Sequence, residues 1–141
     1  MPAVPDTPAN EQVLLGFDFG LQRVGVAVGN TLSRTARPLC IVRGKSRAEH
    51  FDQIQKLIQT WQPHKLVVGL PLLTDGSEQL ETRQARRFAR QLHGRFGLAV
   101  AMVNEWGSTR QAQQYVSGQD EDDHIAAAII LQRWLDEPTE P

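Results

Sequence analysis

The chain has 141 residues, of which 40% are hydrophobic and 22% charged, a composition typical of one globular domain with a core of ordinary size. Its single cysteine, Cys40, excludes an internal disulfide framework, and no apolar run is long enough to span a membrane, so we expect a cytoplasmic protein without a membrane partner. The formal net charge of −1 conceals a segregation, because residues 19–48 contain six bases and no acid, whereas residues 120–141 contain seven acids and one base. These counts fit a basic face beside an acidic pocket, and they fit a mixed solvated surface equally well.

The first segment of the chain carries no pattern of regular structure. Residues 1–12 lack the basic start and the apolar block of a signal peptide, so we expect a flexible N-terminal tail. Residues 13–137 contain no linker or internal repeat and are expected to form a single domain, followed by a C-terminal tail at residues 138–141.

Three strand patterns follow the tail. Residues 14–20 (LLGFDFG) and 23–30 (RVGVAVGN) predict a hairpin whose second strand alternates valines with small residues. Residues 38–44 (PLCIVRG) predict a third strand that begins at Pro38 and ends at Gly44, with Cys40 as a buried core thiol rather than a nucleophile. We expect these strands to pair as an antiparallel meander.

The remainder of the chain alternates helices with strands. Ser46 is placed to cap a helix that runs to Trp61, and further helices are predicted at residues 78–96, 108–116 and 122–137. Strands are predicted at residues 65–71 and 98–104, the first of them continuously apolar after Lys65, as is typical of a strand buried on both faces. Strands separated by helices favour parallel crossovers. We therefore predict an α/β fold with a five-stranded mixed sheet, antiparallel in its first three strands and then parallel, flanked by helices.

Three acids lie where a strand ends or a helix begins: Asp18, Glu105 and Asp123. Each has an ordinary explanation, since Asp18 can form a turn, Glu105 can be the first exposed residue after a strand, and Asp123 can cap a helix. Helical stepping of about 100° per residue nevertheless places Asp123 on the same apolar stripe as Ala127 and Trp134, which should face the sheet.

These acids can converge at one edge of the sheet, because ligand sites in such folds gather at the carboxyl ends of strands. Hard carboxylate oxygens suit Mg²⁺ or Mn²⁺, and two such ions can activate a water and stabilise the leaving oxygen in phosphodiester cleavage. The four histidines of the chain show no ligand spacing, which argues against zinc.

The helix predicted at residues 78–96 has a basic side and an apolar side. Its basic side carries Arg83, Arg86, Arg87 and Arg90 within a sector of about 100°, opposite an apolar sector around Phe88. Guanidinium groups bind phosphates through forked contacts, which position a nucleic acid without reading its sequence. A basic solvated face is the alternative, and the spacing alone favours neither.

Five segments in order, LLGFDFGLQRVGVAVGN, ARPL, LVVGLPLLTDGSE, NEWGST and DDHIAAAIILQRWL, resemble the YqgF (RuvX) family over residues 13–137. The resemblance implies a ribonuclease H-like fold and a Mg²⁺- or Mn²⁺-dependent nuclease that processes the 5′ end of pre-16S ribosomal RNA by two-metal hydrolysis. It implies that Asp18, Glu105 and Asp123 are the catalytic and metal-binding residues. The expected substrate-binding residues are Gly20, Arg23, Arg83, Arg86, Arg87, Arg90, Ser108 and Thr109. The expected partners are pre-16S rRNA or another structured RNA, and ribosomal particles, with the protein a monomer or a weak dimer.

The chain departs from the family pattern in two places. Asn104 and Trp106 flank Glu105 where the family usually has aspartate and arginine, and residues 113–122 form a shorter and more acidic segment. An amide brings no negative charge, and tryptophan cannot pair with a phosphate as arginine does. Two other interpretations stay open: a dimeric DNA nuclease that resolves Holliday junctions, and a non-catalytic factor that binds rRNA or the ribosome and has lost turnover through Asn104 and Trp106. A nucleotide-binding ATPase would need two related domains, and the chain has room for one.

Overall fold

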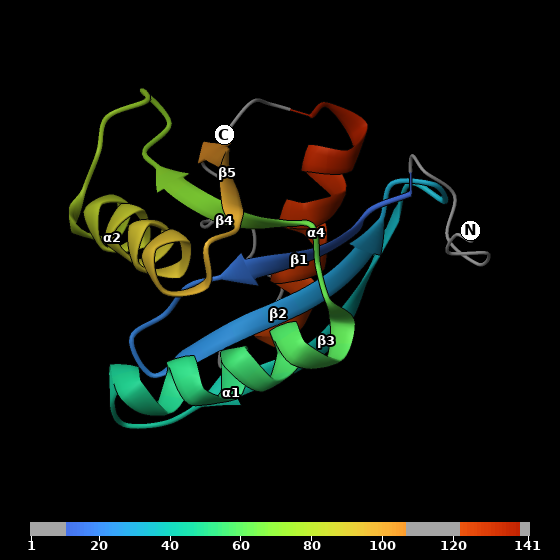
Figure 1. Ribbon diagram of the computed structural model, residues 1–141. Coiled ribbons are helices and arrows are strands. Elements are labelled where there is room, and N and C mark those ends of the chain that lie inside the picture. The colour runs from blue at the N-terminus through green and yellow to red at the C-terminus, as the bar shows by residue number, and fades with distance from the viewer. Residues whose placement is uncertain (1–10, 107–121, 139–141) are drawn as a thin grey trace, which may run out of the picture.

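The computed structural model describes residues 11–106 and 122–138, and in these ranges five strands form one mixed sheet (Figure 1). The strands are β1 (Val13–Asp18), β2 (Arg23–Asn30), β3 (Thr35–Arg43), β4 (Lys65–Leu72) and β5 (Ala99–Trp106), in the spatial order β3-β2-β1-β4-β5. β1, β2 and β3 pair antiparallel, whereas β4 is parallel to both β1 and β5. The predicted mixed sheet is confirmed.

One strand begins earlier than the sequence predicts. Pro38 lies inside β3, which begins at Thr35, so the prediction that this proline starts the strand is wrong. β3 is an edge strand, and its pairing with β2 shifts register at Leu39. An edge position beside such a bulge tolerates proline, because no N–H donor is needed there.

The boundaries of other elements also differ from the predicted ones. β5 runs to Trp106, so Glu105 lies within the strand rather than after it. The helix predicted from residue 78 begins at Leu80, and the helix predicted at residues 108–116 lies outside the described residues. Of the predicted N-terminal tail, Glu11 and Gln12 are described, and the backbone N–H of Gln12 donates to Thr31 Oγ1 at 2.9 Å.

Helix α1 (Arg47–Trp61) is capped by Ser46, as its sequence predicts, and the cap is one half of a capping box with Glu49. Ser46 Oγ accepts the backbone N–H of Glu49 at 3.2 Å, and Glu49 Oε1 accepts the backbone N–H of Ser46 at 3.1 Å. This exchange satisfies two N–H groups that would otherwise lack partners at the start of the helix. Phe51 and Ile54 then face the sheet and are buried.

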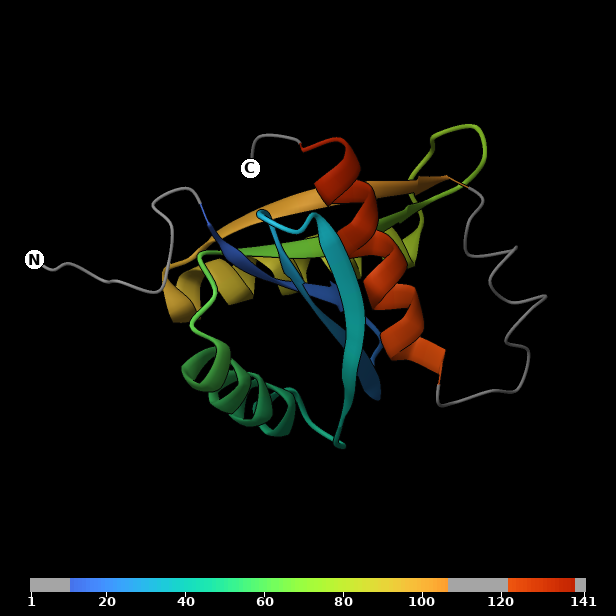
Figure 2. The ribbon, with the colours of Figure 1, turned by 90° about the vertical axis from the view of Figure 1, so that its right-hand side faces the viewer.

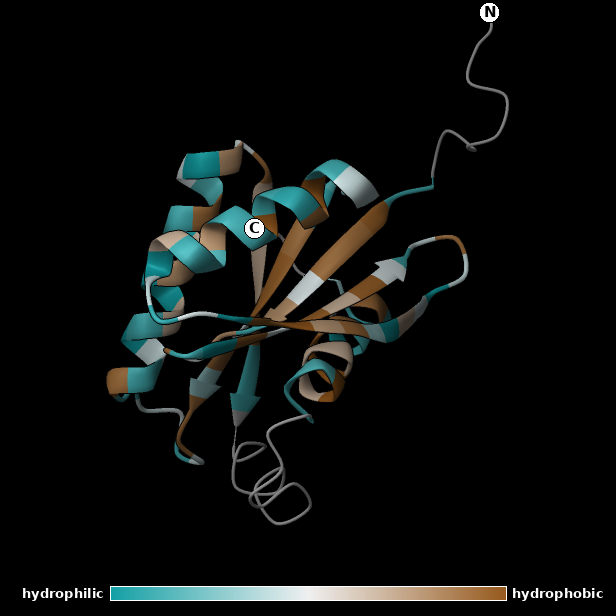
Figure 3. Ribbon diagram, turned by 90° about the horizontal axis from the view of Figure 1, so that it is seen from below, coloured by the Kyte–Doolittle hydropathy of each residue, from teal (hydrophilic) through white to brown (hydrophobic). Residues whose placement is uncertain are grey.

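The sheet separates two apolar cores. One lies beneath α1 and α2 (Leu80–Phe96) and includes Phe17 and Phe88, and the other lies beneath α4 (Asp123–Asp136) and includes Leu14 and Leu131. Figure 2 shows α4 on one side of the sheet, and α1 and α2 on the other. Figure 3 shows apolar strands at the centre and polar residues along the outer faces of the helices.

Cys40 in β3 is half-buried rather than fully buried, and it packs against the core beneath α1 and α2. Partial burial raises the pKa of its thiol, so the reactive thiolate is disfavoured at neutral pH. In the described ranges, none of the helices has the length and apolar character that crossing a membrane would require.

Phe88 contacts three other aromatic rings in the core beneath α1 and α2. Its ring stacks on Phe19 at 4.6 Å between centroids and contacts Phe17 and Phe51 at 5.9 Å each. We expect Phe88→Ala to lower the free energy of unfolding by about 3–5 kcal/mol. Urea denaturation measures the change. Ile129→Ala, at an apolar residue that is 54% exposed, is the control and should change stability by less than about 0.5 kcal/mol.

Candidate active site at the carboxyl edge of the sheet

Strand alternation directs two of the three predicted acids toward α4. Leu14 of β1 packs beneath α4, whereas Phe17 packs beneath α1 and α2. Because successive side chains of a strand point to opposite faces, Asp18 lies on the same face as Leu14. In β5, Ala101 also packs beneath α4, and the same alternation places Glu105 on that face.

The start of α4 lies against the same edge. Asp18 pairs with Gly25 of β2, and a Cβ atom at Gly25 would overlap the backbone of Asp123. Only glycine lets the main chain of the helix come so close to the strand. Asp123 is thereby held beside the strand residue that pairs with Asp18.

Glu105 reaches across β4 toward β1. Its carboxylate lies over Gly69, where a Cβ atom would overlap Glu105 Oε2. The last paired residues of β1 and β4 are Phe17 and Val68, so the residues that follow them, Asp18 and Gly69, lie at neighbouring positions. The Glu105 carboxylate therefore extends in the direction of Asp18, and the missing side chain of Gly69 leaves room for it.

Asp18 has the most perturbed electrostatics of this edge. Burial raises its pKa to about 8, and the carboxylates of Glu105 and Asp123 add to the rise in that order. The two other acids are thus close enough to repel a charge on Asp18. In the absence of a metal ion, Asp18 keeps its proton at neutral pH.

Asp123 already has a positive partner. Arg23 Nε donates to Asp123 Oδ2 at 2.8 Å, and the two side chains are 33% and 28% exposed. We predicted Arg23 as a substrate-binding residue, and in this structure it neutralises one of the candidate catalytic acids. It lies at the start of β2, directly after the loop that carries Gly20.

A cleft of about 450 Å³ opens at this edge. Its lining includes Asp18 and Asp123, the β1–β2 loop from Phe19 to Gln22, and Glu81 and Gln84 of α2. Sequence reasoning missed Glu81 and Gln84. Their spacing of three residues at the start of a helix was a usable signal, but the apolar and basic sides of the same helix dominated the pattern.

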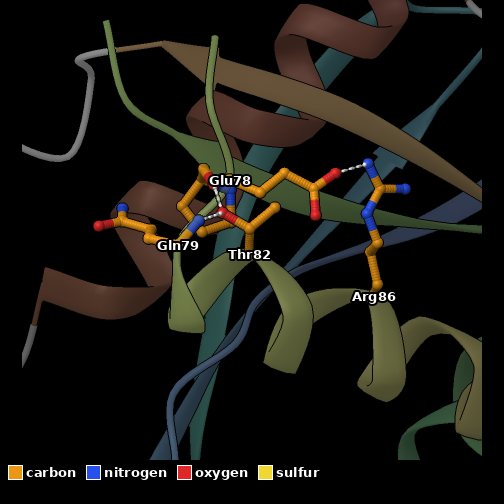
Figure 4. A network of polar contacts seen from close by, with 5 residues as sticks. Glu78, Gln79, Thr82 and Arg86 are labelled. Atoms are coloured by element: carbon orange, nitrogen blue, oxygen red, sulfur yellow. Dashed lines mark hydrogen bonds and ion pairs between the residues drawn. The ribbon is translucent and has the colours of Figure 1, made fainter.

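Thr82 joins the start of α2 to the end of β4 beside this cleft (Figure 4). It is fully buried, its Oγ1 donates to the carbonyl oxygen of Pro71, and the same atom accepts the backbone N–H of Gln79 at 3.0 Å. Pro71 lines the cleft and pairs with Glu105 across the parallel strands. The hydroxyl of Thr82 therefore fixes α2 relative to the strand that neighbours Glu105.

The predicted arginine row of α2 is present on the solvent side, opposite the buried Phe88. Arg83, Arg87 and Arg90 are exposed. Arg86 is half-buried, and its Nη2 donates to Glu78 Oε2 at 2.6 Å (Figure 4). Glu78 therefore offsets the charge of one of the four arginines.

The remaining residues singled out in the sequence lie outside the described ranges or at the end of β5. Ser108, Thr109 and residues 113–121 lie outside the described part of the chain. Asn104 is exposed at the end of β5, and its carbonyl oxygen accepts Arg133 Nη1 of α4 at 3.3 Å. This contact adds a link between β5 and the helix that carries Asp123.

The donor set of this edge fits a hard divalent cation. Asp18, Glu105 and Asp123 offer carboxylate oxygens, and a divalent cation between them would relieve the repulsion that keeps Asp18 protonated. Within residues 11–106 and 122–138, however, no three acidic, histidine or cysteine side chains are already grouped closely enough to hold a metal ion together. Arg23 holds Asp123 in the present arrangement. The residue types fit a divalent cation, but the three carboxylates are not close enough together in this arrangement to bind one jointly.

Comparison with known proteins agrees with the motifs. A model of the RuvX family, described as Holliday junction resolvase, matches residues 12–137. A protein of Bordetella parapertussis named "Putative pre-16S rRNA nuclease" is 55% identical over 131 residues, which cover 93% of this chain and 98% of the relative. A protein of the same name from Nitrosococcus oceani is 44% identical over 138 residues, which cover 93% of this chain and 91% of that one.

A solved structure shares the fold. The crystal structure of the fowlpox virus Holliday junction resolvase matches with a TM-score of 0.51 at 9% identity, over 88% of this chain and 98% of that one. At so low an identity the likeness concerns the fold alone, and it confirms the predicted ribonuclease H-like architecture.

We expect Gly69→Ala to displace the Glu105 carboxylate, because the added Cβ atom would overlap it. The affinity for Mn²⁺, measured by the loss of the free-ion electron paramagnetic resonance signal, should fall by about tenfold or more. Gly94→Ala is the control, because a Cβ atom at this helical glycine meets nothing within 4 Å. Equal Mn²⁺ affinities for the two variants would contradict the placement of Glu105.

In metal-free protein, the raised pKa of Asp18 should make stability fall as the pH rises. Between about pH 4 and pH 8 the folded state keeps a proton that the unfolded chain releases, so the free energy of unfolding decreases by up to about 1.4 kcal/mol per pH unit. Asp18→Asn cannot titrate and should give a flatter profile. Urea unfolding in EDTA across this range measures both proteins, and parallel profiles would contradict the raised pKa.

Proposed function

The chain belongs to the RuvX family, and from this premise we propose that it is a metal-dependent nuclease that hydrolyses phosphodiester bonds at the 5′ end of pre-16S rRNA. The family match and the nuclease names of the relatives support phosphodiester hydrolysis. The rRNA substrate, the two-metal mechanism and Mg²⁺ or Mn²⁺ as the cofactor are parts of the proposal.

One observation carries the proposal: three carboxylates from β1, β5 and α4 are directed to one edge of the sheet, and two of them raise the pKa of the third. Like charges are costly to keep together in a folded protein unless a cation or a proton compensates them. A structural turn or cap would not need such an arrangement. An acidic edge beside a cleft is what a nuclease with divalent cations requires.

In the proposed reaction, Asp18, Glu105 and Asp123 would hold the cations. When bound, these ions supply an activated water and stabilise the leaving oxygen. Asp18 contributes as a carboxylate, which requires loss of the proton that it keeps in the metal-free protein. Arg23, next to Asp123, is placed to contact a phosphate of the substrate strand once Asp123 turns to a cation.

Arg83, Arg87 and Arg90 on α2 would hold the nucleic acid backbone outside the cleft. They are exposed, and their helix is fixed to the cleft by Thr82. Contacts of this type bring affinity without base recognition, so structured RNA of many sequences should bind. Specificity for one cleavage position would then depend on RNA shape or on a ribosomal particle.

A junction-resolving DNA nuclease is the second candidate, because the matching family model is described as Holliday junction resolvase. Resolution of a four-way junction needs two symmetric cuts and therefore a dimer. Light scattering with and without a synthetic four-way junction separates the two candidates, since a resolvase must bring two copies to one junction.

We expect Asp18→Asn to reduce Mn²⁺-dependent cleavage of a labelled pre-16S leader RNA by at least about a thousandfold, because the neutral amide cannot replace an ionised ligand. Asp52→Asn, at an exposed acid on α1, is the control and should cleave at the normal rate. Denaturing gels measure the rates, and binding in EDTA shows whether the RNA is still held.

The outcomes separate three interpretations. Cleavage by Asp18→Asn at the rate of Asp52→Asn would contradict the role of Asp18. Binding of RNA by the unmodified protein without any metal-dependent product would favour a non-catalytic rRNA-binding factor. Cleavage of the four-way junction in preference to RNA would favour the resolvase.

A further inference from the structure

A ladder of aromatic rings lies between α1 and α2 and carries an arginine at each end. Phe19 stacks on Phe88 at 4.6 Å between centroids, and Phe51 stacks on the same ring at 5.9 Å. The guanidinium of Arg47 lies over Phe19 at 5.5 Å, and that of Arg95 lies over Phe51 at 4.3 Å. Each guanidinium is thus held at a fixed position by a ring that is itself fixed by Phe88.

Arg47 is held from a second direction as well. Its Nη1 donates to Gln91 Oε1 of α2, which joins the first residue of α1 to the neighbouring helix. Phe19, the ring beneath Arg47, lines the cleft. Arg47 therefore lies next to a residue of the cleft wall, and a guanidinium with five N–H donors keeps further donors for a ligand.

A line of residues on α2 continues from the cleft past Arg47. Gln84 lines the cleft, and Arg87, Gln91 and Arg95 follow it at steps of three and four residues, which keeps them on one side of the helix. The contacts of Gln91 with Arg47 and of Arg95 with Phe51 show that this side faces α1. Arg87 and Arg95 are exposed, and Arg47 is half-buried.

We propose that three arginines bind the phosphodiester backbone of a nucleic acid strand that leaves the cleft and then runs between α1 and α2. These residues, which we name the arginine seam, are Arg47, Arg87 and Arg95. The inference rests on the proposed function, because it assigns a path to the substrate of that cleft. It also gives a role to Arg47, the last base of the acid-free run of residues 19–48.

Charge complementarity and continuity with the cleft support a phosphate backbone as the occupant. Glu49, an acid two residues after Arg47, is held by the capping box, where its carboxylate accepts the backbone N–H groups of Lys45 and Ser46. Guanidiniums that are fixed before binding lose little rotamer freedom when they bind phosphate, and their forks match phosphate oxygens. Backbone contacts of this kind extend the binding site without adding base recognition.

Arg47→Ala should weaken binding of an RNA duplex with a single-stranded 5′ overhang by roughly tenfold near 0.1 M KCl. It should also lower the slope of log K against log salt by about one, because one phosphate contact is lost. Fluorescence anisotropy of the labelled RNA in EDTA measures both quantities without cleavage. Arg47→Lys keeps the charge and should retain most of the slope.

Arg37→Ala is the matched control. Arg37 also lies over an aromatic ring, that of Trp61 at 5.4 Å, but it lines a separate pocket with Val13, Asn30 and Thr35. Removal of this charge should leave the slope unchanged. Circular dichroism melting of each variant shows whether a loss of binding comes from unfolding, and Arg47→Gln provides a second neutral variant if Arg47→Ala is unstable.

Equal slopes for Arg47→Ala, Arg47→Gln and Arg37→Ala would overturn the arginine seam. Failure of the proposed nuclease function gives a different pattern, in which the unmodified protein forms no product with Mn²⁺ while the Arg47 variants still bind RNA with a reduced slope. Intact cleavage with unchanged slopes would refute the seam alone.

Discussion

The site depends on the close approach of α4 to the sheet. Glycines of the strands face this helix, and side chains at these positions would overlap it: Gly16 and Gly29 meet Leu131, and Gly25 meets the backbone of Asp123. The opposite face of the sheet is covered by large apolar side chains, which hold α1 and α2. The helix on the glycine-bearing face therefore packs closer to the sheet than the helices on the other face. This close approach brings the start of α4, and Asp123 on it, within electrostatic range of Asp18 at the end of β1.

Charge within the site is balanced in two ways in the metal-free protein. Asp18 holds a proton because burial and the two neighbouring acids raise its pKa, and Asp123 holds the guanidinium of Arg23. A divalent cation would compete with both, displacing the proton and the arginine. Repulsion among the three carboxylates lowers the stability of the folded protein when no metal ion is bound. Such a cost is common where function rather than packing determines the residues.

Patterns of the sequence predicted most of the fold and the three acids, but not their contacts. Alternating valines predicted β2 without error, and Ser46 predicted the start of α1, because these signals are local. The place of Pro38 inside β3 depends on that strand being an edge, which only tertiary structure determines.

The contacts of the site are decided between elements that are distant in the chain. The Arg23–Asp123 pair joins residues that no local pattern connects, and the way Glu105 lies over Gly69 depends on the register of two parallel strands. The edge strand β3 has a consequence beyond the site: with Pro38 inside it and Arg37 and Arg43 along it, it makes a poor template for strands of other molecules. Aggregation by sheet extension is disfavoured along this border while the chain refolds at high concentration.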